Sequence, residues 1–233
     1  MKIQINTQSV VNVLNIGDEN TPVIYIDDFL LNIDLLKKYA VEKAHFVRES
    51  NSSYPGLRAT FPQEFLDVIS PLIVRPIRQI FQIPENYQEF IARSDYSIIT
   101  TPAETCRPAQ KIPHADSSRM GDFAILFYIN DGDFGGTSFY RQKATGIELL
   151  TNKNEQRYWQ VVNNFIKDYE DNEISFINGS DSHYERIGGI AYKPNRLVIY
   201  PTFLLHSGDL TDSCINNKPQ TGRLTANVMM FFA

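Results

Sequence analysis

The chain has 233 residues and a mass of 26.7 kDa, and 22 Lys+Arg against 27 Asp+Glu give a net charge of −5. A mildly acidic chain without a run of basic residues is a poor ligand for nucleic acids or anionic membranes, so both are excluded as partners. The 42% hydrophobic and 21% charged residues are ordinary for a globular protein and argue against extended disorder. The length allows a single all-β domain.

The cysteines and the N-terminus indicate where the protein works. Cys106 and Cys214 are too few for a disulfide framework, and we expect free thiols, as in a reducing cytoplasm. The first residues, Met-Lys-Ile-Gln-Ile-Asn-Thr-Gln, lack the apolar region of a signal peptide. No apolar run approaches the ~18 residues of a membrane span. The sequence therefore predicts a soluble, cytoplasmic protein.

Apolar residues at helical spacing predict three helices. Asn32 is a suitable N-cap for the first, and Pro62 suits the first turn of the second. Pro71 and Pro76 are expected to break or kink the second helix into two pieces, because proline lacks an N–H and clashes with the preceding turn. The helices are expected at about 32–40, 62–80 and 154–169.

Short stretches rich in Ile, Val, Phe, Tyr and Thr predict strands over most of the remaining chain. Their spacing is typical of a β-sandwich or jelly roll. We therefore predict a mainly β fold with flanking helices, a cupin-like double-stranded β-helix with the first two helices packed outside. One domain is expected, with helical N-terminal support over about 27–82 and a jelly-roll core over about 90–233 that contains the third helix as an insertion. The expected strands are 22–26, 91–100, 123–129, 136–140, 184–192, 196–201, 204–208 and 223–232.

Two short motifs pair a histidine with a carboxylate two residues later. Residues i and i+2 of a strand point to one face, so the side chains of His114 and Asp116 are expected to converge. Two histidines and one carboxylate on a single face leave coordination positions open, which suits a non-haem Fe(II) centre. The second pair, His183-Tyr-Glu185, shows that such a motif is weak alone and that its context must decide.

The segments that follow His114 resemble a known family in their order. They are Phe123-Ala-Ile-Leu-Phe-Tyr128-Ile-Asn130, a Gly135-Gly136 turn into an aromatic strand, a Pro-Asn-Arg196 turn before a strand and His206, and Gly222-Arg223 opening the last strand. This layout resembles the Fe(II)/2-oxoglutarate-dependent oxygenases, and within them the prolyl-hydroxylase-like branch, over about 90–233. The resemblance implies Fe(II), 2-oxoglutarate as cosubstrate and O₂. It also implies hydroxylation of a small-molecule or peptidyl substrate with release of succinate and CO₂.

The resemblance assigns the metal ligands. It implies that His114, Asp116 and His206 bind the iron and form the catalytic centre. The 90 residues between Asp116 and His206 exceed the spacing in compact members of the family, and the inserted third helix accounts for the excess. His183 and Glu185 are interpreted as surface or wall residues, because no Tyr-Ile-Asn strand follows them.

The cosubstrate residues follow partly from chemistry and partly from the resemblance. Arg223 and Thr225 share one face of a strand, and an arginine fork with a neighbouring hydroxyl suits a carboxylate. In the family this arginine binds the distal carboxylate of 2-oxoglutarate. The resemblance implies that Tyr128 contacts the same carboxylate, and Leu126 is expected to pack against the cosubstrate's methylenes. Asn130 is expected to shape the turn rather than touch the ligand.

Two other classes stay open, a jelly-roll hydrolase or isomerase with a different divalent metal and a non-catalytic jelly-roll binding module. A hydrolase needs no buried carboxylate clamp, so Arg223 and Thr225 separate the oxygenase from the first alternative. Arg119 is expected either to meet an anionic substrate or to pair with Asp122. The substrate and the oligomeric state are not predicted.

Overall fold

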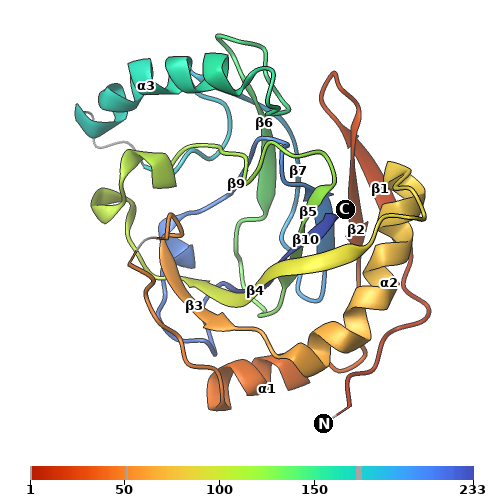
Figure 1. Cartoon of the computed structure of the whole chain (residues 1–233). Helices are drawn as coiled ribbons and strands as arrows, with labels where there is room; N and C mark the ends of the chain where they lie inside the picture. The colour runs from red at the N-terminus through yellow and green to blue at the C-terminus, as the bar shows by residue number, and fades with distance from the viewer. Residues whose placement is uncertain (1, 51, 172–174) are drawn as a thin grey trace.

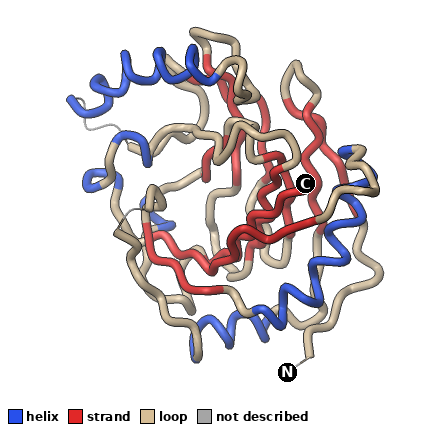
Figure 2. Tube along the Cα trace, viewed as in Figure 1, coloured by secondary structure: helices blue, strands red, loops and turns tan. Residues whose placement is uncertain are grey.

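The computed structural model describes residues 2–50, 52–171 and 175–233. Within this part, the strands form two antiparallel sheets, with helices around their periphery (Figures 1 and 2). The larger sheet has seven strands in the order β1-β2-β8-β5-β10-β4-β3, and the smaller has the order β7-β6-β9. The strands are β1 Val11–Ile16, β2 Thr21–Ile26, β3 Gly56–Thr60, β4 Glu89–Ile99, β5 Asp122–Tyr128, β6 Thr137–Gln142, β7 Tyr184–Ile190, β8 Leu197–Pro201, β9 His206–Gly208 and β10 Leu224–Phe232. The α-helices are α1 Asp34–Glu42, α2 Gln63–Phe81 and α3 Glu155–Asp171, and short 3-10 turns lie at Ala103–Thr105, Pro108–Gln110 and Asp212–Cys214.

The two faces of the larger sheet pack against different partners. One face is buried against α1 and α2, which run along its outer side (Figure 1). The expectation that the first two helices lie outside the sheets is confirmed. The opposite face packs against the smaller sheet, in a cluster that includes Leu126, Tyr128 and Tyr200 from the larger sheet and Phe139 and Leu204 from the other layer. Side chains of this inner face therefore point into the space between the sheets.

Helix α2 is continuous, and the predicted break at Pro71 and Pro76 is wrong. An interior proline costs a helix about 3 kcal/mol. Burial of one large apolar side chain contributes about 1.5–3 kcal/mol, and the face of α2 that meets the sheet carries six of them. A break would pull part of this face off the sheet. These six side chains are Phe65, Leu66, Ile69, Ile73, Val74 and Ile77.

The N-terminal region contributes more to the sheet than the sequence predicts. Strands β1 and β3 were not expected, and β3 lies within the segment interpreted as helical support. Strand β3 pairs along β4, and a Cβ on Gly56 would lie 1.9 Å from the Ile98 carbonyl oxygen. This close approach explains the glycine and depends on a partner strand distant in sequence.

The expectation of free thiols agrees with the structure. Cys106 and Cys214 are both free and buried. None of the described helices is long and apolar enough to cross a membrane.

Candidate active site

Backbone pairing brings His114 and His206 together. The N–H of each residue donates to the carbonyl of the other, with N···O distances of 2.9 and 2.8 Å. Such reciprocal bonds hold two residues directly opposite each other, and the two imidazole rings lie 4.7 Å apart. The Asp116 N–H donates to the Thr202 carbonyl at 2.9 Å, which fixes the carboxylate next to them. His114 forms an isolated bridge rather than part of the strand on which its convergence with Asp116 was predicted.

The three side chains form a group that can hold a metal ion. Their ligand atoms all lie within 4.8 Å of one another. Asp116 Oδ2 lies 3.4 Å from His206 Nε2, and Asp116 Oδ1 lies 3.7 Å from His114 Nε2. Ligands about 2.1 Å from a shared metal stand roughly 3.0–3.4 Å apart, so a small inward shift suffices. Two imidazoles and one carboxylate on a single side suit a first-row divalent ion with open positions.

The tautomer of His206 is suited to metal binding. Its Nδ1 lies 2.8 Å from the Leu204 carbonyl oxygen. A carbonyl only accepts, so Nδ1 carries the hydrogen and the Nε2 lone pair faces Asp116. The Tyr200 ring lies edge-on to the imidazole at 4.7 Å and shields it from water. Burial raises the pKa of Tyr200 well above its usual value, and Asp116 adds to this effect, so the phenol stays neutral.

The charges around the group favour the protonation states in which these side chains can bind a metal. Burial raises the pKa of Asp116, but contact with His206 and the charges of His206 and His114 in their protonated forms and of Arg58 outweigh it, so the pKa is lowered. Partial desolvation and the neighbouring His206 lower the pKa of His114. A metal needs an ionised carboxylate and neutral imidazoles, and these shifts favour both.

The second histidine–carboxylate pair lies outside this group. Glu185 is paired with Arg141 at 2.9 Å, and its side chain is 47% exposed. The His183 ring stacks on Phe165 with ring centroids 4.1 Å apart. In the described residues, the group able to hold a metal therefore contains the first pair and not the second.

Arg223 is buried immediately before β10, and its guanidinium is anchored by backbone. Its Nε donates to the Gly135 carbonyl at 2.9 Å and its Nη2 to the Gly136 carbonyl at 3.1 Å. Arginine has five N–H donors, so Nη1 and one hydrogen of Nη2 are left, a fork matched to a carboxylate. The residue is only 4% exposed, so water does not compete strongly for these donors.

The Gly135-Gly136 turn is tight because other backbone approaches it. A Cβ on Gly135 would lie 1.6 Å from the Asp209 carbonyl oxygen, and one on Gly136 would lie 2.0 Å from the Ile190 carbonyl oxygen. Any side chain here would push the two anchoring carbonyls away from Arg223. The glycine pair in the sequence motif thus positions the arginine.

Aromatic and hydroxyl side chains surround the Arg223 guanidinium, and we call this group of residues the closed end of the site. The guanidinium carbon of Arg223 lies 5.6 Å from the Tyr128 ring and 5.8 Å from the Tyr192 ring. Tyr128 and Thr225 are directly opposite each other on β5 and β10, so both point to the inner face. The Tyr128 hydroxyl shares a hydrogen bond of 2.8 Å with Thr137 Oγ1. If Thr137 donates in this bond, the phenol can donate to a ligand.

The closed end and the metal group lie on one side of β9. A Cβ on Gly208 would lie 3.9 Å from Arg223 Nη2. His206 and Gly208 are two residues apart on the strand, so they face the same side at about 6.6 Å. The end carbons of a five-carbon diacid are about 5 Å apart. The inner-face residue Leu126 packs beside Tyr128 and Tyr200. The separation thus fits a diacid that reaches from the arginine to the metal group.

Two further expectations from the sequence concern Asn130 and Arg119. Asn130 shapes a turn as expected, because its Nδ2 donates to the carbonyls of Pro219 and Gly222, just before Arg223. Arg119 lies 3.8 Å from Asp122 with its side chain 61% exposed, which favours the pairing alternative. Sequence reasoning missed Tyr200 and Arg58 as neighbours of the metal group. The alternation of side chains along β8 could have placed Tyr200 on the inner face. No feature of the sequence indicates that Arg58 lies near the metal group.

Comparisons with known proteins follow this geometry. A family model described as a family of unknown function (DUF6445) matches residues 7–231. A search of curated proteins found no match. Among solved structures, the chain is similar to HygX from Streptomyces hygroscopicus with nickel and 2-oxoglutarate bound, with 11% identity, a TM-score of 0.52 and coverage of 91% of this chain and 84% of HygX. It is also similar to SnoN, a non-heme alpha ketoglutarate dependent epimerase from nogalamycin biosynthesis, with 10% identity, a TM-score of 0.50 and coverage of 91% and 79%. At these identities the likeness shows a shared fold.

Proposed function

Since the chain belongs to the DUF6445 family, whose function is unknown, we propose its function from the site: an Fe(II)- and 2-oxoglutarate-dependent oxygenase. We propose that it hydroxylates a small-molecule or peptidyl substrate with release of succinate and CO₂. Two fold relatives support the cofactors, since HygX is seen with nickel and 2-oxoglutarate and SnoN is an alpha ketoglutarate dependent epimerase. The same likeness supports the double-stranded β-helix as the arrangement of the two sheets. The order of the sequence motifs is our ground for proposing a single domain of the prolyl-hydroxylase-like branch. The two free thiols support a cytoplasmic location.

The proposed metal ligands are His114 and His206 through Nε2 and Asp116 through its carboxylate. The hydrogen bond from His206 Nδ1 to the Leu204 carbonyl holds that ring in the ligating tautomer. When bound, Fe(II) supplies the redox chemistry that couples cosubstrate decarboxylation to substrate oxidation. Tyr200 stays neutral beside His206 and limits water on that side.

The proposed cosubstrate site is the space between Arg223 and the metal group. Arg223 offers its remaining fork to the distal carboxylate of 2-oxoglutarate, with Tyr128 and Thr225 as hydroxyl donors. Leu126 packs along the methylenes between this end and the metal group. A carboxylate that enters this pocket loses its water, and only fixed donors replace it well.

One observation carries the proposal: a buried, backbone-anchored arginine fork lies on the His206 side of β9, at a separation that suits a five-carbon diacid. A hydrolase or isomerase has no need of such a clamp. We therefore place the oxygenase above the two alternatives.

The test is the substitution Arg223→Ala, with Arg119→Ala as the exposed arginine control. Loss of the fork leaves a buried carboxylate unpaired, which costs about 3–5 kcal/mol, so 2-oxoglutarate affinity should fall more than a hundredfold. Fe(II) affinity should survive in both variants. We would titrate 2-oxoglutarate anaerobically into the Fe(II) protein and measure substrate-uncoupled succinate formation. Equal 2-oxoglutarate affinity in wild type and Arg223→Ala would end the assignment.

A further inference from the structure

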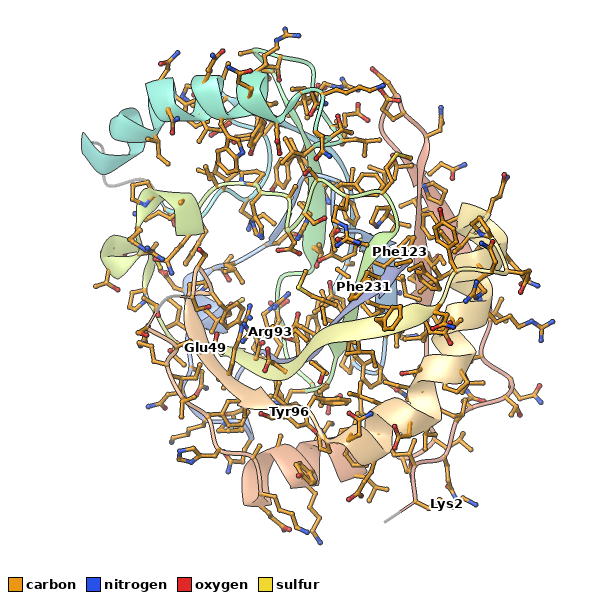
Figure 3. The ribbon with its side chains drawn as sticks, in the orientation of Figure 1. Lys2, Glu49, Arg93, Tyr96, Phe123 and Phe231 are labelled. Carbon is orange, nitrogen blue, oxygen red and sulfur yellow. The ribbon has the colours of Figure 1, made fainter. Side chains whose placement is uncertain are left out.

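Ser97 extends the closed end onto strand β4. It is directly opposite Thr225, which is itself directly opposite Tyr128 on β5, so the three side chains form a row across the inner face of the larger sheet. The preceding residue, Tyr96, points to the outer face, where its hydroxyl donates to the Leu36 carbonyl of α1 at 3.1 Å (Figure 3). Directly opposed residues lie roughly 4.5–5.5 Å apart between their Cα atoms. Ser97 and Tyr128 therefore flank Thr225 at short range.

Tyr54, in the loop before β3, brings a second hydroxyl to the same place. A Cβ on Gly56 would lie 2.9 Å from Cε1 of the Tyr54 ring, so the ring packs directly on this glycine. The Arg58 guanidinium lies 4.6 Å from the centre of the same ring, and Arg58 is directly opposite Ser97. Gly56 pairs with the last residue of β4, and this end of β4 pairs with the start of β10, immediately after Arg223. The Tyr54 ring therefore lies at the end of the sheet that carries Arg223.

The hydroxyls of Ser97 and Tyr54 are buried, and neither makes a hydrogen bond within the described part of the chain. Burial raises the pKa of Tyr54 to about 12, although the charges of Arg223 and Arg58 and the nearby Ser97 hydroxyl oppose the rise, so the phenol keeps its hydrogen at neutral pH. Each hydroxyl carries one hydrogen, so even when one donates to the other, a hydrogen still lacks an acceptor. Buried donors without an acceptor destabilise a protein, which indicates that an acceptor binds at this place.

The distal carboxylate of the proposed cosubstrate is an acceptor that suits this position. A carboxylate has about four lone-pair positions. The free fork of Arg223 fills two of them, and the Thr225 hydroxyl can fill a third. Tyr128 supplies the fourth donor only when Thr137 donates in the bond that they share. Ser97, in contrast, has no other acceptor among the described residues, so its hydrogen is available for the carboxylate.

We propose that Ser97 donates a hydrogen bond to the distal carboxylate of 2-oxoglutarate and that Tyr54 donates to the Ser97 oxygen. Ser97 is thus a cosubstrate-binding residue, and Tyr54 is a positioning residue that acts through it. The closed end binds the carboxylate from β4 as well as from β5 and β10. This inference rests on the proposed function, because it takes 2-oxoglutarate to be bound at Arg223. It assigns to Ser97 and Tyr54 the selection of a diacid over a 2-oxo acid that ends in a methyl group.

The test compares 2-oxoglutarate with 2-oxopentanoate, the 2-oxo acid of equal length that lacks the distal carboxylate. Each is titrated by calorimetry into the Ni(II)-loaded protein. Ser97→Ala should weaken 2-oxoglutarate binding about tenfold, because it removes one hydrogen bond to a charged group, and Tyr54→Phe, which keeps the ring, should weaken it several-fold. Both variants should bind 2-oxopentanoate as the wild type does, since this acid has no group for Ser97 to bind.

Two matched controls come from other faces of the same elements of the fold. Ser70→Ala removes a hydroxyl that is also buried and unbonded among the described residues, but it lies on α2. Tyr96→Phe removes the buried phenol hydroxyl that precedes Ser97 in sequence and donates to α1. Both controls should leave the affinity for 2-oxoglutarate unchanged.

Other results would overturn the proposal. Equal 2-oxoglutarate affinity in wild type, Ser97→Ala and Tyr54→Phe would leave the two hydroxyls to a bound water. An equal loss for 2-oxopentanoate and 2-oxoglutarate would also contradict it, because the effect would then not come from the distal carboxylate. A loss in Ser97→Ala alone would remove the role of Tyr54. Failure of the oxygenase assignment would look different, since the wild-type protein would then bind no 2-oxoglutarate at all.

Discussion

Two arginines near the inner face of the larger sheet, Arg223 and Arg58, are held in opposite ways. At the closed end, two backbone carbonyls fix Arg223, and the rings of Tyr128 and Tyr192, 4.5 Å from each other, lie together beside its guanidinium. Arg58 on β3 has an ion pair with Asp95 at 3.8 Å and a buried Nε without a partner among the described residues. The closed end is thus preorganised before any ligand arrives, whereas Arg58 is not held by such hydrogen bonds.

This difference bears on what each arginine can bind. Preorganised donors cost no reorganisation on binding, which suits a ligand that is the same in every turnover. Unsatisfied donors destabilise the free protein and are retained only if a ligand or solvent satisfies them. We infer that the closed end is specialised for the cosubstrate.

The largest effect is expected from breaking the anchor of the closed end. Gly136→Ala would place a Cβ 2.0 Å from the Ile190 carbonyl oxygen and displace a carbonyl that Arg223 uses. The free energy of unfolding should fall by about 3 kcal/mol, since neither backbone can move freely. Chemical denaturation would measure it. Gly208→Ala is the control, because its Cβ meets only ordinary contacts of 3.4 Å or more, and its stability should change by less than about 1 kcal/mol. Equal stability of the two variants would show that the turn is not constrained.

The next effect concerns the metal group. Asp116→Ala should lower the affinity for Fe(II) or Ni(II) about a hundredfold, because it removes the one carboxylate of the group. Stability without metal should change by less than about 1 kcal/mol, since this side chain is 32% exposed.

The matched control for Asp116 is Glu185→Ala, from the second histidine–carboxylate pair. It loses an exposed ion pair with Arg141 and should keep full metal affinity, measured by anaerobic titration. Loss of metal binding in Glu185→Ala with retention in Asp116→Ala would mean that the first motif was chosen wrongly.

The sequence predicted the core strands because their side chains are β-branched or aromatic and bounded by turn residues. It missed β3, whose Gly56-Leu-Arg58-Ala-Thr60 has little such character and is stabilised by pairing with a distant strand. Helix α2 shows the same limit of local sequence rules. These rules treat its two interior prolines as breaks, but burial of the helix against the sheet outweighs them.

The site, too, was predicted where local patterns decide and missed where distant pairing decides. The order of motifs identified the residues that the structure brings together at the metal group and the closed end, because these follow the strands that were predicted. The inner-face position of Arg58 could not be predicted, since this residue lies on the missed strand. Pairing with the distant strand β4 places it, and no local pattern in the sequence indicates that pairing.

The smallest effect tests whether the closed end depends on its supporting turn. The buried side chain of Asn130 donates from Nδ2 to the Pro219 and Gly222 carbonyls at 2.8 and 2.9 Å and so holds the turn that leads into Arg223. Asn130→Ala leaves two carbonyls without a donor and loosens the arginine without removing it. We expect 2-oxoglutarate affinity to fall about tenfold, equivalent to ~1.4 kcal/mol, with Fe(II) affinity unchanged. Asn12→Ala is the control, because this partly exposed asparagine on β1 also donates to a backbone carbonyl but lies in a different part of the sheet. If the two alanine variants bind 2-oxoglutarate equally well, the carbonyl anchors alone fix Arg223 and the turn plays no part.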